Sequence, residues 1–280
     1  MIILLYNPLS RNGGNSKYIK KIVDDLSKTD EVIAHSLLDI FDVEKFIQTF
    51  KKDDKIVVLG GDGTLNKLVN ATKEYPITQD IYMFQAGTGN DFLRSLKTKE
   101  KMININKYLT DLPVVESETE NLKFFNGIGL GLDGLISDLV NNSRFKKNKF
   151  NYFRHAIEGF IKYNPVSGTI TIDDKEIKEN KLWFVSVMNG PYFGGGMKIA
   201  PFANRMEKDL DVVLVKNVPK LLLILIFPTI YLGWHRIFKR YITFYKAKNV
   251  KIDIDSSCYM QVDGEVYYPV QKVKASVLWH

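Results

Sequence analysis

Three glycines and one carboxylate follow an apolar run in the stretch KIVVLGGDGTLNKLVN, residues 55–70. Glycines at 60, 61 and 63 permit positive φ and let a bulky anion approach the backbone without meeting a Cβ atom. A helix beginning near Thr64 would point its N–H groups at the same place, which suits a phosphate. Asp62 would repel a bare phosphate, so its presence implies a Mg²⁺ ion or a proton to be removed. The stretch therefore predicts a site for phosphate transfer.

The same turn also has a structural interpretation, in which the glycines make a tight bend and Asp62 caps the helix. Two further loops weigh against that interpretation. QAGTGNDFLRSL (85–96) and YNPLSRNGGNS (6–16) are also polar, bear glycines and lie between a predicted strand and a predicted helix. Because ligands of open α/β sheets bind beyond the carboxyl ends of the strands, we expect the three loops to line one edge of one sheet.

The elements that must carry these loops alternate through the first hundred residues. Apolar strands are predicted at 2–6, 31–36, 55–60 and 80–87, and amphipathic helices at 16–28, 42–52 and 64–73. Alternating strands and helices with short connections are typical of an open, mostly parallel sheet with helices on both faces. The sequence thus predicts an α/β nucleotide-binding domain over residues 1–112.

After Pro113 the pattern changes to a predominantly antiparallel one. Two helices are predicted at 135–148 and 151–163, and most other segments alternate apolar and polar residues as strands do. We expect residues 113–270 to form a second domain that packs closely against the first and leaves a cleft between them.

The composition narrows the classes of function. The chain has 280 residues, of which 45% are hydrophobic, enough for two cores. A single cysteine, Cys258, excludes an internal disulfide and favours a reducing compartment. The four histidines are scattered without metal-ligand spacing. The N-terminal MIILLYNPLS lacks a basic region and reads as a first strand, so a cytoplasmic protein is predicted.

The charge favours polyanionic partners, since 39 Lys and Arg residues against 32 Asp and Glu residues give a formal net charge of +7. Much of the excess lies in RFKKNKFNYFR (144–154) and HRIFKRYITFYKAKNVK (235–251), where aromatic residues are interleaved with basic ones. Membrane interfaces favour that mixture. A solvated basic face is an equally good interpretation of the sequence alone.

The stretch PKLLLILIFPTIYLGWHRIFKR (219–240) is more apolar than a surface helix should be. It is either a helix buried against the second domain or an interfacial element, with Trp234, Arg236, Lys239 and Arg240 at the level of lipid headgroups. Its apolar part, 221–234, falls short of the roughly 20 residues that a membrane span needs.

Together the motifs resemble those of the diacylglycerol kinase catalytic family, which includes bacterial lipid kinases and sphingosine kinases. The motifs are GGDGTLN (60–66), GTGNDF (87–92), NP followed by Ser10, NGIGLGLDG (126–134), GGGMKIAPFA (194–203) and VDGE (262–265). They occur in the family's order and span nearly the whole chain, whereas GGDGT alone would also suit NAD kinases and phosphofructokinases. The resemblance implies an N-terminal α/β domain and a C-terminal antiparallel β-sandwich, with the last strand, 271–280, returning to the first domain.

The resemblance also implies which residues hold ATP. They are Asn7, Pro8, Leu9, Ser10, Arg11, Ser36, Gly60, Gly61, Asp62, Gly63, Thr64, Leu65, Asn66 and Thr88. Asp62 would also be the protein ligand of the nucleotide Mg²⁺. Similarity to bacterial lipid kinases makes Glu265 the proton acceptor, and similarity to sphingosine kinases makes it Asp62. The residues themselves support either, because each is a carboxylate beside a glycine in a turn, and the Asp263–Glu265 segment also reads as a polar hairpin turn.

Two departures from the family pattern stand out. Arg11 occupies a position that is usually glycine. The segment NRMEKDLD (204–211) has Glu207 and Lys208 where bacterial lipid kinases have an Asp-Gly pair of a structural Mg²⁺ site. Asn204, Glu207 and Asp209 are the candidate ligands that remain, but the lost glycine and the added cation argue against an intact site.

The expected function is that of an ATP- and Mg²⁺-dependent lipid kinase that is cytoplasmic and peripherally bound to an anionic membrane surface. No nucleic-acid partner is expected, and a homodimer is left open. One rival is a kinase with a soluble acceptor, as in NAD kinase, although the Asn-Glu pair expected of that enzyme is absent. The other is a nucleotide- or lipid-binding regulator without turnover, which the altered NRMEKDLD segment suggests.

Overall fold

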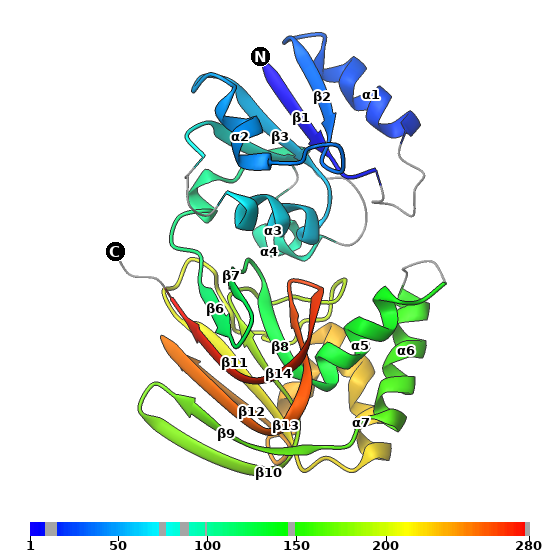
Figure 1. Ribbon diagram of the computed structural model, residues 1–280. Coiled ribbons are helices and arrows are strands. Elements are labelled where there is room, and N and C mark those ends of the chain that lie inside the picture. Colours follow the sequence, from blue (N-terminus) through cyan, green and yellow to red (C-terminus); the bar gives the residue numbers. More distant parts are fainter. Residues whose placement is uncertain (9–15, 73–76, 85–89, 99, 145–148, 278–280) are drawn as a thin grey trace. The chain divides into compact units, whose positions relative to one another are not determined.

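The computed structural model of the chain describes residues 1–8, 16–72, 77–84, 90–98, 100–144 and 149–277 (Figure 1). The chain divides into two units. The first unit consists of Met1–Leu93 and Lys97–Thr110, and the second consists of Arg94–Leu96 and Asp111–His280.

Four short apolar strands form the parallel part of the sheet in the first unit. They are β1 (Ile2–Tyr6), β2 (Val32–Ser36), β3 (Lys55–Leu59) and β4 (Asp80–Phe84), and the edge strand β5 (Met102–Asn104) pairs antiparallel with β4. The order across the sheet is β2-β1-β3-β4-β5. Successive residues of β1 and β3 are buried, because both faces of a parallel sheet are covered.

Helices follow the strands of the first unit in turn. They are α1 (Ser16–Leu26), α2 (Val43–Gln48), α3 (Asp62–Ala71), α4 (Asp91–Leu96), of which the first three residues belong to this unit, and the 3₁₀ helix η2 (Asn106–Tyr108). Ile22 of α1 packs on Ile2, Leu4 and Val57, which project from one face of the sheet. The predicted α/β architecture is confirmed, as a mixed sheet with helices.

The second unit is built on an antiparallel sheet. Its strands are β6 (Val114–Ser117), β7 (Asn121–Lys123), β8 (Gly127–Gly131), β9 (Val166–Ile172), β10 (Lys175–Met188), β11 (Leu210–Lys216), β12 (Ile242–Ala247), β13 (Asn249–Val262) and β14 (Glu265–Ser276). The order is β12-β11-β10-β8-β13-β14-β6-β7, and β9 pairs with both β10 and β13.

Two long strands fold this sheet over on itself. The register of β10 shifts between Glu179 and Leu182, and the register of β13 shifts between Asp253 and Cys258. The first halves of both strands pair with β9, and their second halves pair with β8. Side chains from both halves meet in one apolar cluster. The predicted antiparallel sandwich is therefore confirmed, with bulges supplying the bend.

Helices cover part of this sheet (Figure 1). They are α5 (Leu132–Asn141), α6 (Lys149–Lys162), α7 (Lys220–Ile226) and the 3₁₀ helices η3 (Phe227–Leu232) and η4 (Trp234–Ile237). Trp183 of β10 is 1% exposed beneath them. Pro228 lacks an N–H group, so the α-helix gives way to η3 there, and Gly233, with φ 71°, separates η3 from η4.

The last strand differs from the expectation. Residues 271–276 belong to β14, which pairs with β13 and with β6 inside the second unit rather than returning to the first sheet. The apolar residues of β14 are satisfied there, since Val270, Val273 and Ala275 are buried in the sandwich core. None of the helices within the described ranges is both long and apolar enough to cross a lipid bilayer.

Candidate functional site

The carboxyl ends of four parallel strands lie level at one edge of the first sheet. Tyr6 of β1 lies opposite Ser36 of β2 and Leu59 of β3, and Leu59 lies opposite Phe84 of β4. The strand order changes direction between β1 and β3, because β2 lies on one side of β1 and β4 lies beyond β3. Open α/β sheets bind ligands at such a switch point, beyond the strand ends.

The structure brings several of the predicted nucleotide residues to this edge. Asn7 follows β1, and its N–H donates to the carbonyl of Leu59 at 3.4 Å. Ser36 ends β2 and is buried, and its Oγ accepts the N–H of Leu38 at 3.2 Å. Pro8 follows Asn7 directly. Four other predicted contacts lie outside the described residues, namely Leu9, Ser10, Arg11 and Thr88.

The glycine turn after β3 works by close approach rather than by unusual dihedral angles. A Cβ atom on Gly60 would lie 2.5 Å from the Cβ of Thr64. Gly61, the N-cap of α3, has φ −98°, so the positive φ expected there is not used. The helix begins at Asp62, two residues before the predicted start, and runs through Gly63, Thr64, Leu65 and Asn66. Only glycine leaves the first turn of the helix this close to the strand.

The carboxylate of Asp62 joins two of the predicted loops. Its Oδ2 accepts the backbone N–H of Asp91 at 2.7 Å, and its Oδ1 accepts the backbone N–H of Phe92 at 3.0 Å. Both donors open α4, directly after the GTGN segment. Asp62 thus caps α4 from the first turn of α3, so the capping role considered from the sequence is present, but on α4 and not on the helix that follows the turn.

A Mg²⁺ ion fits this part of the first unit. Mg²⁺ on a nucleotide is usually held by one or two carboxylates together with phosphate oxygens and water, and not by a cage of protein ligands. Asp62 supplies such a carboxylate, and the buried Asp91 stands beside it. Asp62 would hold the ion, which would neutralise charge on the phosphates.

In the second unit the DGE motif forms a two-residue hairpin loop between β13 and β14. Val262 pairs with Glu265, and the two loop residues Asp263 and Gly264 have φ 48° and 94°. Positive φ at both central positions is the signature of a type I′ turn, which favours Asp-Gly. The hairpin turn considered from the sequence is therefore present.

Asp263 fixes this turn to the start of β8. Its Oδ2 accepts the N–H of Phe125 at 2.7 Å, and its Oδ1 accepts the N–H groups of Asn126 and Gly127 at 2.8 and 3.1 Å. A carboxylate that accepts three backbone N–H groups holds its loop in place. Glu265, half-buried at the first position of β14, is the carboxylate of the motif that this anchoring positions.

A buried acid that the sequence did not single out also supports the turn. Gln261 donates from Nε2 to Oδ2 of Asp133 at 3.0 Å, and its Oε1 accepts the N–H of Gly264 at 2.9 Å. Burial raises the pKa of Asp133 to about 7, while the bond from Gln261 opposes this rise. Gly129 makes room for the acid, because a Cβ atom there would lie 1.8 Å from Oδ2 of Asp133. In the sequence, the closely spaced glycines of NGIGLGLDG are the feature that could have indicated a buried side chain here.

Arg205 is a second residue that sequence reasoning missed. It donates from Nη1 to the carbonyl of Phe125 and from Nη2 to Oδ1 of Asn126, both at 3.0 Å. These residues are the ones whose N–H groups Asp263 holds. Arg205 lies in the segment that departs from the family pattern, so that segment supports the DGE turn through an arginine.

The candidate ligands of a structural Mg²⁺ have other partners. Glu207 forms an ion pair with Lys246, and Asn204 donates to Glu207 at 3.4 Å. The bond from Lys246 keeps the pKa of Glu207 below its usual range, and the bond to Glu207 raises the pKa of Lys246, helped by nearby Asp211 and Asp209. No group of three His, Cys, Asp or Glu side chains with metal-binding geometry occurs in the described part of the chain. The residues 204–209 therefore do not fit a divalent ion, because an ammonium is already bound there.

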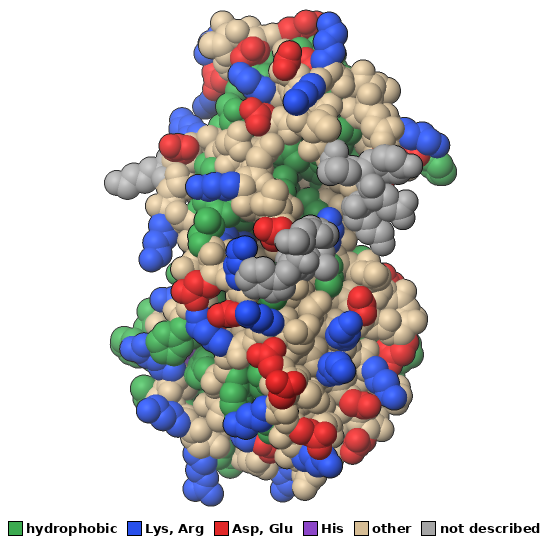
Figure 2. All heavy atoms as spheres, turned by 90° about the vertical axis from the view of Figure 1, so that its left-hand side faces the viewer, with side chains coloured by type: hydrophobic (Ala, Val, Ile, Leu, Met, Phe, Trp, Pro, Cys, Tyr) green, Lys and Arg blue, Asp and Glu red, His purple; other side chains and the backbone are tan. Residues whose placement is uncertain are grey.

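A hollow of about 630 Å³ lies on the outer face of the second sheet, away from these motifs. Its walls carry ion pairs between Lys272 and Asp253, Lys274 and Glu116, and Lys178 and Glu176. Figure 2 shows a face on which acidic and basic side chains are interspersed in the same way. Paired exposed charges of this kind suit a solvated surface and not a ligand pocket.

Comparison with known proteins places the two units in described families. Residues 1–120 match the family described as "Diacylglycerol kinase catalytic domain", and residues 126–277 match the family described as "YegS C-terminal NAD kinase beta sandwich-like domain". The two matches cover nearly the whole chain, and the second covers more than half of it.

Individual relatives agree with these matches. The Bacillus subtilis (strain 168) protein named "Putative lipid kinase YtlR" is 28% identical over 238 residues, which are 79% of this chain and 76% of that protein. "Diacylglycerol kinase" of Mycobacterium tuberculosis (strain CDC 1551 / Oshkosh) is 27% identical over 200 residues, 66% of this chain and 62% of that protein. A crystal structure described as "a putative diacylglycerol kinase from Bacillus anthracis str. Sterne" has a TM-score of 0.72 at 23% identity and covers 99% of this chain and 92% of that one. At that identity the structural likeness concerns the fold.

Proposed function

Because the chain belongs to the diacylglycerol kinase catalytic family, we propose that it transfers the γ-phosphate of ATP to the hydroxyl of a diacylglycerol-like lipid, with Mg²⁺ as cofactor. The observation that carries the proposal is the bond between the two glycine-bearing loops. Asp62 of the GGDG turn caps α4 directly after GTGN, at the switch point of the sheet. The bond holds the start of α3 at this edge, and the N-terminus of a helix offers backbone N–H groups of the kind that bind an anion.

In the proposed reaction the first unit holds the nucleotide. Asn7, Ser36 and the turn Gly60–Asn66 lie at the sheet edge where the phosphates would bind, and the N-terminus of α3 would face them. Bound Mg²⁺ would offset charge on the phosphates. We also propose that Leu9, Ser10, Arg11 and Thr88 contact the nucleotide, as the family resemblance predicts.

Glu265 is the proposed proton acceptor. It takes the proton of the lipid hydroxyl as that oxygen forms a bond to the γ-phosphorus, and the bond from the γ-phosphorus to its bridging oxygen breaks to release ADP. The geometry favours Glu265 over Asp62 for this role. Both oxygens of Asp62 accept backbone N–H groups of α4, which commits that carboxylate to holding the two loops together.

Transfer of labelled γ-phosphate tests the proposal. Purified protein with Mg²⁺ and labelled ATP is offered diacylglycerol, phosphatidylglycerol, a monoacylglycerol, a long-chain base and a polyprenol in anionic mixed micelles, with NAD as a soluble acceptor. We expect label on a lipid, lost in Glu265→Gln and kept in the control Glu176→Gln, whose exposed carboxylate lines the outer hollow. Label on NAD alone would favour the soluble-acceptor rival. ATP binding without any transfer would favour the non-catalytic regulator.

A further inference from the structure

Two helical segments of the second unit expose an unusual amount of apolar surface. On α6, Phe150 is 76% exposed and Ile161 is 66% exposed, and on α7, Leu221 and Leu225 are 73% and 66% exposed. Leu232, Trp234 and Ile237, in η3 and η4, are between 59% and 69% exposed. We call the exposed apolar residues of this region the α6–η4 surface. Its members are Phe150, Phe153, Ile161, Leu221, Leu225, Leu232, Trp234 and Ile237.

The two helices form one antiparallel pair. Lys220, at the start of α7, donates to the carbonyl of Ile161 near the end of α6 at 3.0 Å. At the other end, the rings of Phe153 and Phe227 lie 5.8 Å apart. Figure 1 shows α6 and α7 side by side on one flank of the second sheet. The exposed residues of both helices therefore lie on one packed helix pair.

Each helix keeps its apolar residues on one stripe. On α6, Phe150, Phe153 and Ile161 recur at helical spacing, and on α7 the exposed leucines are four residues apart. Trp234 and Ile237 are three residues apart in a 3₁₀ helix, where such positions project to the same side. Each element therefore carries its exposed apolar side chains on one side.

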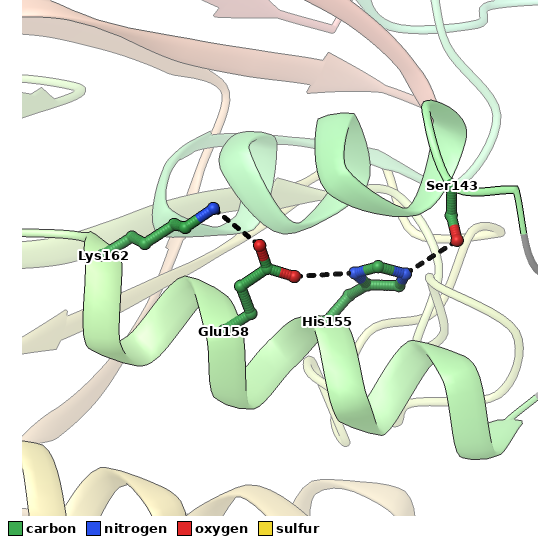
Figure 3. A network of polar contacts seen from close by, with 4 residues as sticks. All are labelled: Ser143, His155, Glu158 and Lys162. Carbon is green, nitrogen blue, oxygen red and sulfur yellow. Dashed lines mark hydrogen bonds and ion pairs between the residues drawn. The ribbon is translucent and has the colours of Figure 1, made fainter.

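Polar contacts on another side of α6 hold it in place (Figure 3). His155, which is 6% exposed, contacts Glu158 at 3.1 Å and Oγ of Ser143 at 2.9 Å, and Lys162 bonds to Glu158 at 2.6 Å. Ser143 follows the end of α5, so the network fastens α6 to α5. The stripe that carries Phe150, Phe153 and Ile161 is separate from this polar stripe.

Buried anchors hold Trp234 outward. His235, beside it, is fully buried and contacts the carbonyl of Ile199 at 2.9 Å. Burial lowers the pKa of His235, so its imidazole stays neutral in this position. On the other side of Trp234, a Cβ atom on Gly233 would lie 3.1 Å from Pro201. The exposed indole is thus fixed by its neighbours.

Along the α7–η4 part of this surface the charge has one sign, and the acid of α6, Glu158, is paired with Lys162. Residues 219–248 contain no Asp or Glu and six Lys or Arg, of which Lys220, Arg236, Lys239 and Arg240 are exposed beside the apolar side chains. Exposed leucine and tryptophan rimmed by cations are the chemistry of a headgroup region, where apolar groups enter the acyl boundary and cations meet phosphates. A second copy of the same surface would place cations opposite cations, so a two-fold dimer is disfavoured there.

We infer that the α6–η4 surface docks onto an anionic lipid bilayer. The inference rests on the proposed function, because a membrane-borne acceptor requires the enzyme to work at a bilayer. Docking inserts the apolar side chains of α6, α7 and η4 to the depth of the headgroups and sets Arg236, Lys239 and Arg240 against lipid phosphates. The surface belongs wholly to the second unit.

Vesicle binding without nucleotide or acceptor tests the inference. The protein is sedimented with vesicles of pure phosphatidylcholine and with vesicles that contain about one-third phosphatidylserine, an anionic lipid without an alcohol that could accept phosphate. We expect binding to the anionic vesicles that weakens with salt. The triple variant Leu221→Gln/Leu225→Gln/Trp234→Gln and the charge variant Arg236→Gln/Lys239→Gln/Arg240→Gln should each bind at least about tenfold more weakly.

Matched controls use exposed residues outside the surface. Leu38→Gln/Phe41→Gln removes side chains that are 59% and 107% exposed in the first unit, and Lys178→Gln/Lys251→Gln/Lys274→Gln removes three cations that line the outer hollow. Both controls should bind as wild type. Equal vesicle binding by wild type and the two surface variants would overturn the inference. The inference would also be overturned if wild type bound no vesicles and formed a concentration-dependent dimer that the surface variants lose.

Failure of this inference can be told from failure of the proposed function. Phosphate transfer is measured in parallel with a short-chain diacylglycerol below its micelle concentration, where docking is not needed. Transfer to that acceptor by a wild type that binds no vesicles would overturn the docking surface alone. Vesicle binding without transfer to any lipid would overturn the kinase proposal alone.

Discussion

Gln261 donates a hydrogen bond from its side-chain amide to the buried carboxyl of Asp133 at 3.0 Å. The same glutamine accepts the N–H of Gly264, so the acid of α5 is linked to the DGE turn through one side chain. Burial raises the pKa of Asp133 to about 7. A titrating group that is bonded to the turn through Gln261 couples the pH to the stability of the turn.

We predict that Asp133→Asn removes a pH dependence of folding stability. In the folded protein the acid keeps its proton up to about pH 7, whereas the unfolded chain loses it near 3.8. The folded state therefore binds the extra proton between these values, and its stability falls as pH rises from about 4 to about 7. The loss amounts to a few kcal/mol, since each pH unit is worth about 1.4 kcal/mol.

Urea unfolding of wild type and Asp133→Asn between pH 4 and pH 8 measures this effect. The neutral amide can still accept the bond from Gln261, so the variant should fold with a flatter profile. Asp24→Asn, an exposed acid of α1, serves as the control and should follow wild type. Parallel profiles for wild type and Asp133→Asn would show that Asp133 is ionised in the folded protein throughout this range.

Substitutions of the two carboxylates of the DGE motif should have different effects, one on catalysis and the other on stability. Glu265→Gln is expected to lower kcat by at least about 100-fold with the melting temperature and ATP affinity little changed, because a proton acceptor is lost while Asp263 still anchors the turn. Asp263→Asn is expected to lower stability by about 1–3 kcal/mol, because it weakens the acceptor of three backbone N–H groups. Thermal unfolding and steady-state kinetics on both variants check this. A Glu265→Gln protein with wild-type kcat would exclude Glu265 as the acceptor.

Asp62→Ala should weaken nucleotide binding through the loss of a cap. Without the carboxylate, the N–H groups of Asp91 and Phe92 lose their acceptor and the GGDG turn is no longer held to α4. Asp42→Ala is a matched control, because Asp42 caps α2 of the same unit through the N–H of Lys45 at 3.0 Å. Each variant should lose about 1 kcal/mol of stability. Calorimetric titration with ATP should show weaker binding for Asp62→Ala only, and equal weakening in both would assign the effect to general destabilisation.

Much of the structure of the first unit can be predicted from the local pattern of apolar and polar residues. Runs such as IILLY and KIVVL are buried on both faces, and the helices between them place an apolar stripe on the sheet, so periodicity alone gives the order of elements. Parallel strands that end in polar, glycine-bearing loops must bring those loops to one edge. The grouping of Asn7, Ser36 and Gly60 therefore follows from the order of strands and loops along the chain.

The second unit depends on pairings that the sequence does not display. Asp263 bonds to residues 136 to 138 positions earlier in the chain, and Gln261 bonds to Asp133, 128 positions earlier. Strand β13 pairs first with β9 and then with β8, because the register shift between Asp253 and Cys258 lets one strand serve both layers. The last strand was expected to return to the first domain, and this prediction was wrong because the long-range pairing of β14 is not visible in the sequence. Its apolar pattern would suit either sheet, and only pairing with β13 and β6 decides between them.

Lys246 should make the thermal stability of the second unit independent of divalent metal ions. Its ammonium pairs with Glu207 and lies near Asp209 and Asp211, so the positive charge that a metal would supply comes from the chain itself. We expect the melting temperature of the nucleotide-free protein to be the same with Mg²⁺ and with EDTA. In Lys246→Met three carboxylates lose their cation, and added Mg²⁺ should then raise the melting temperature in a saturable way. Lys272→Met, which removes an exposed partner of Asp253, is the control and should show no such response. A wild-type protein that Mg²⁺ stabilises as strongly as it stabilises Lys246→Met would mean that the ammonium does not take the place of a metal ion.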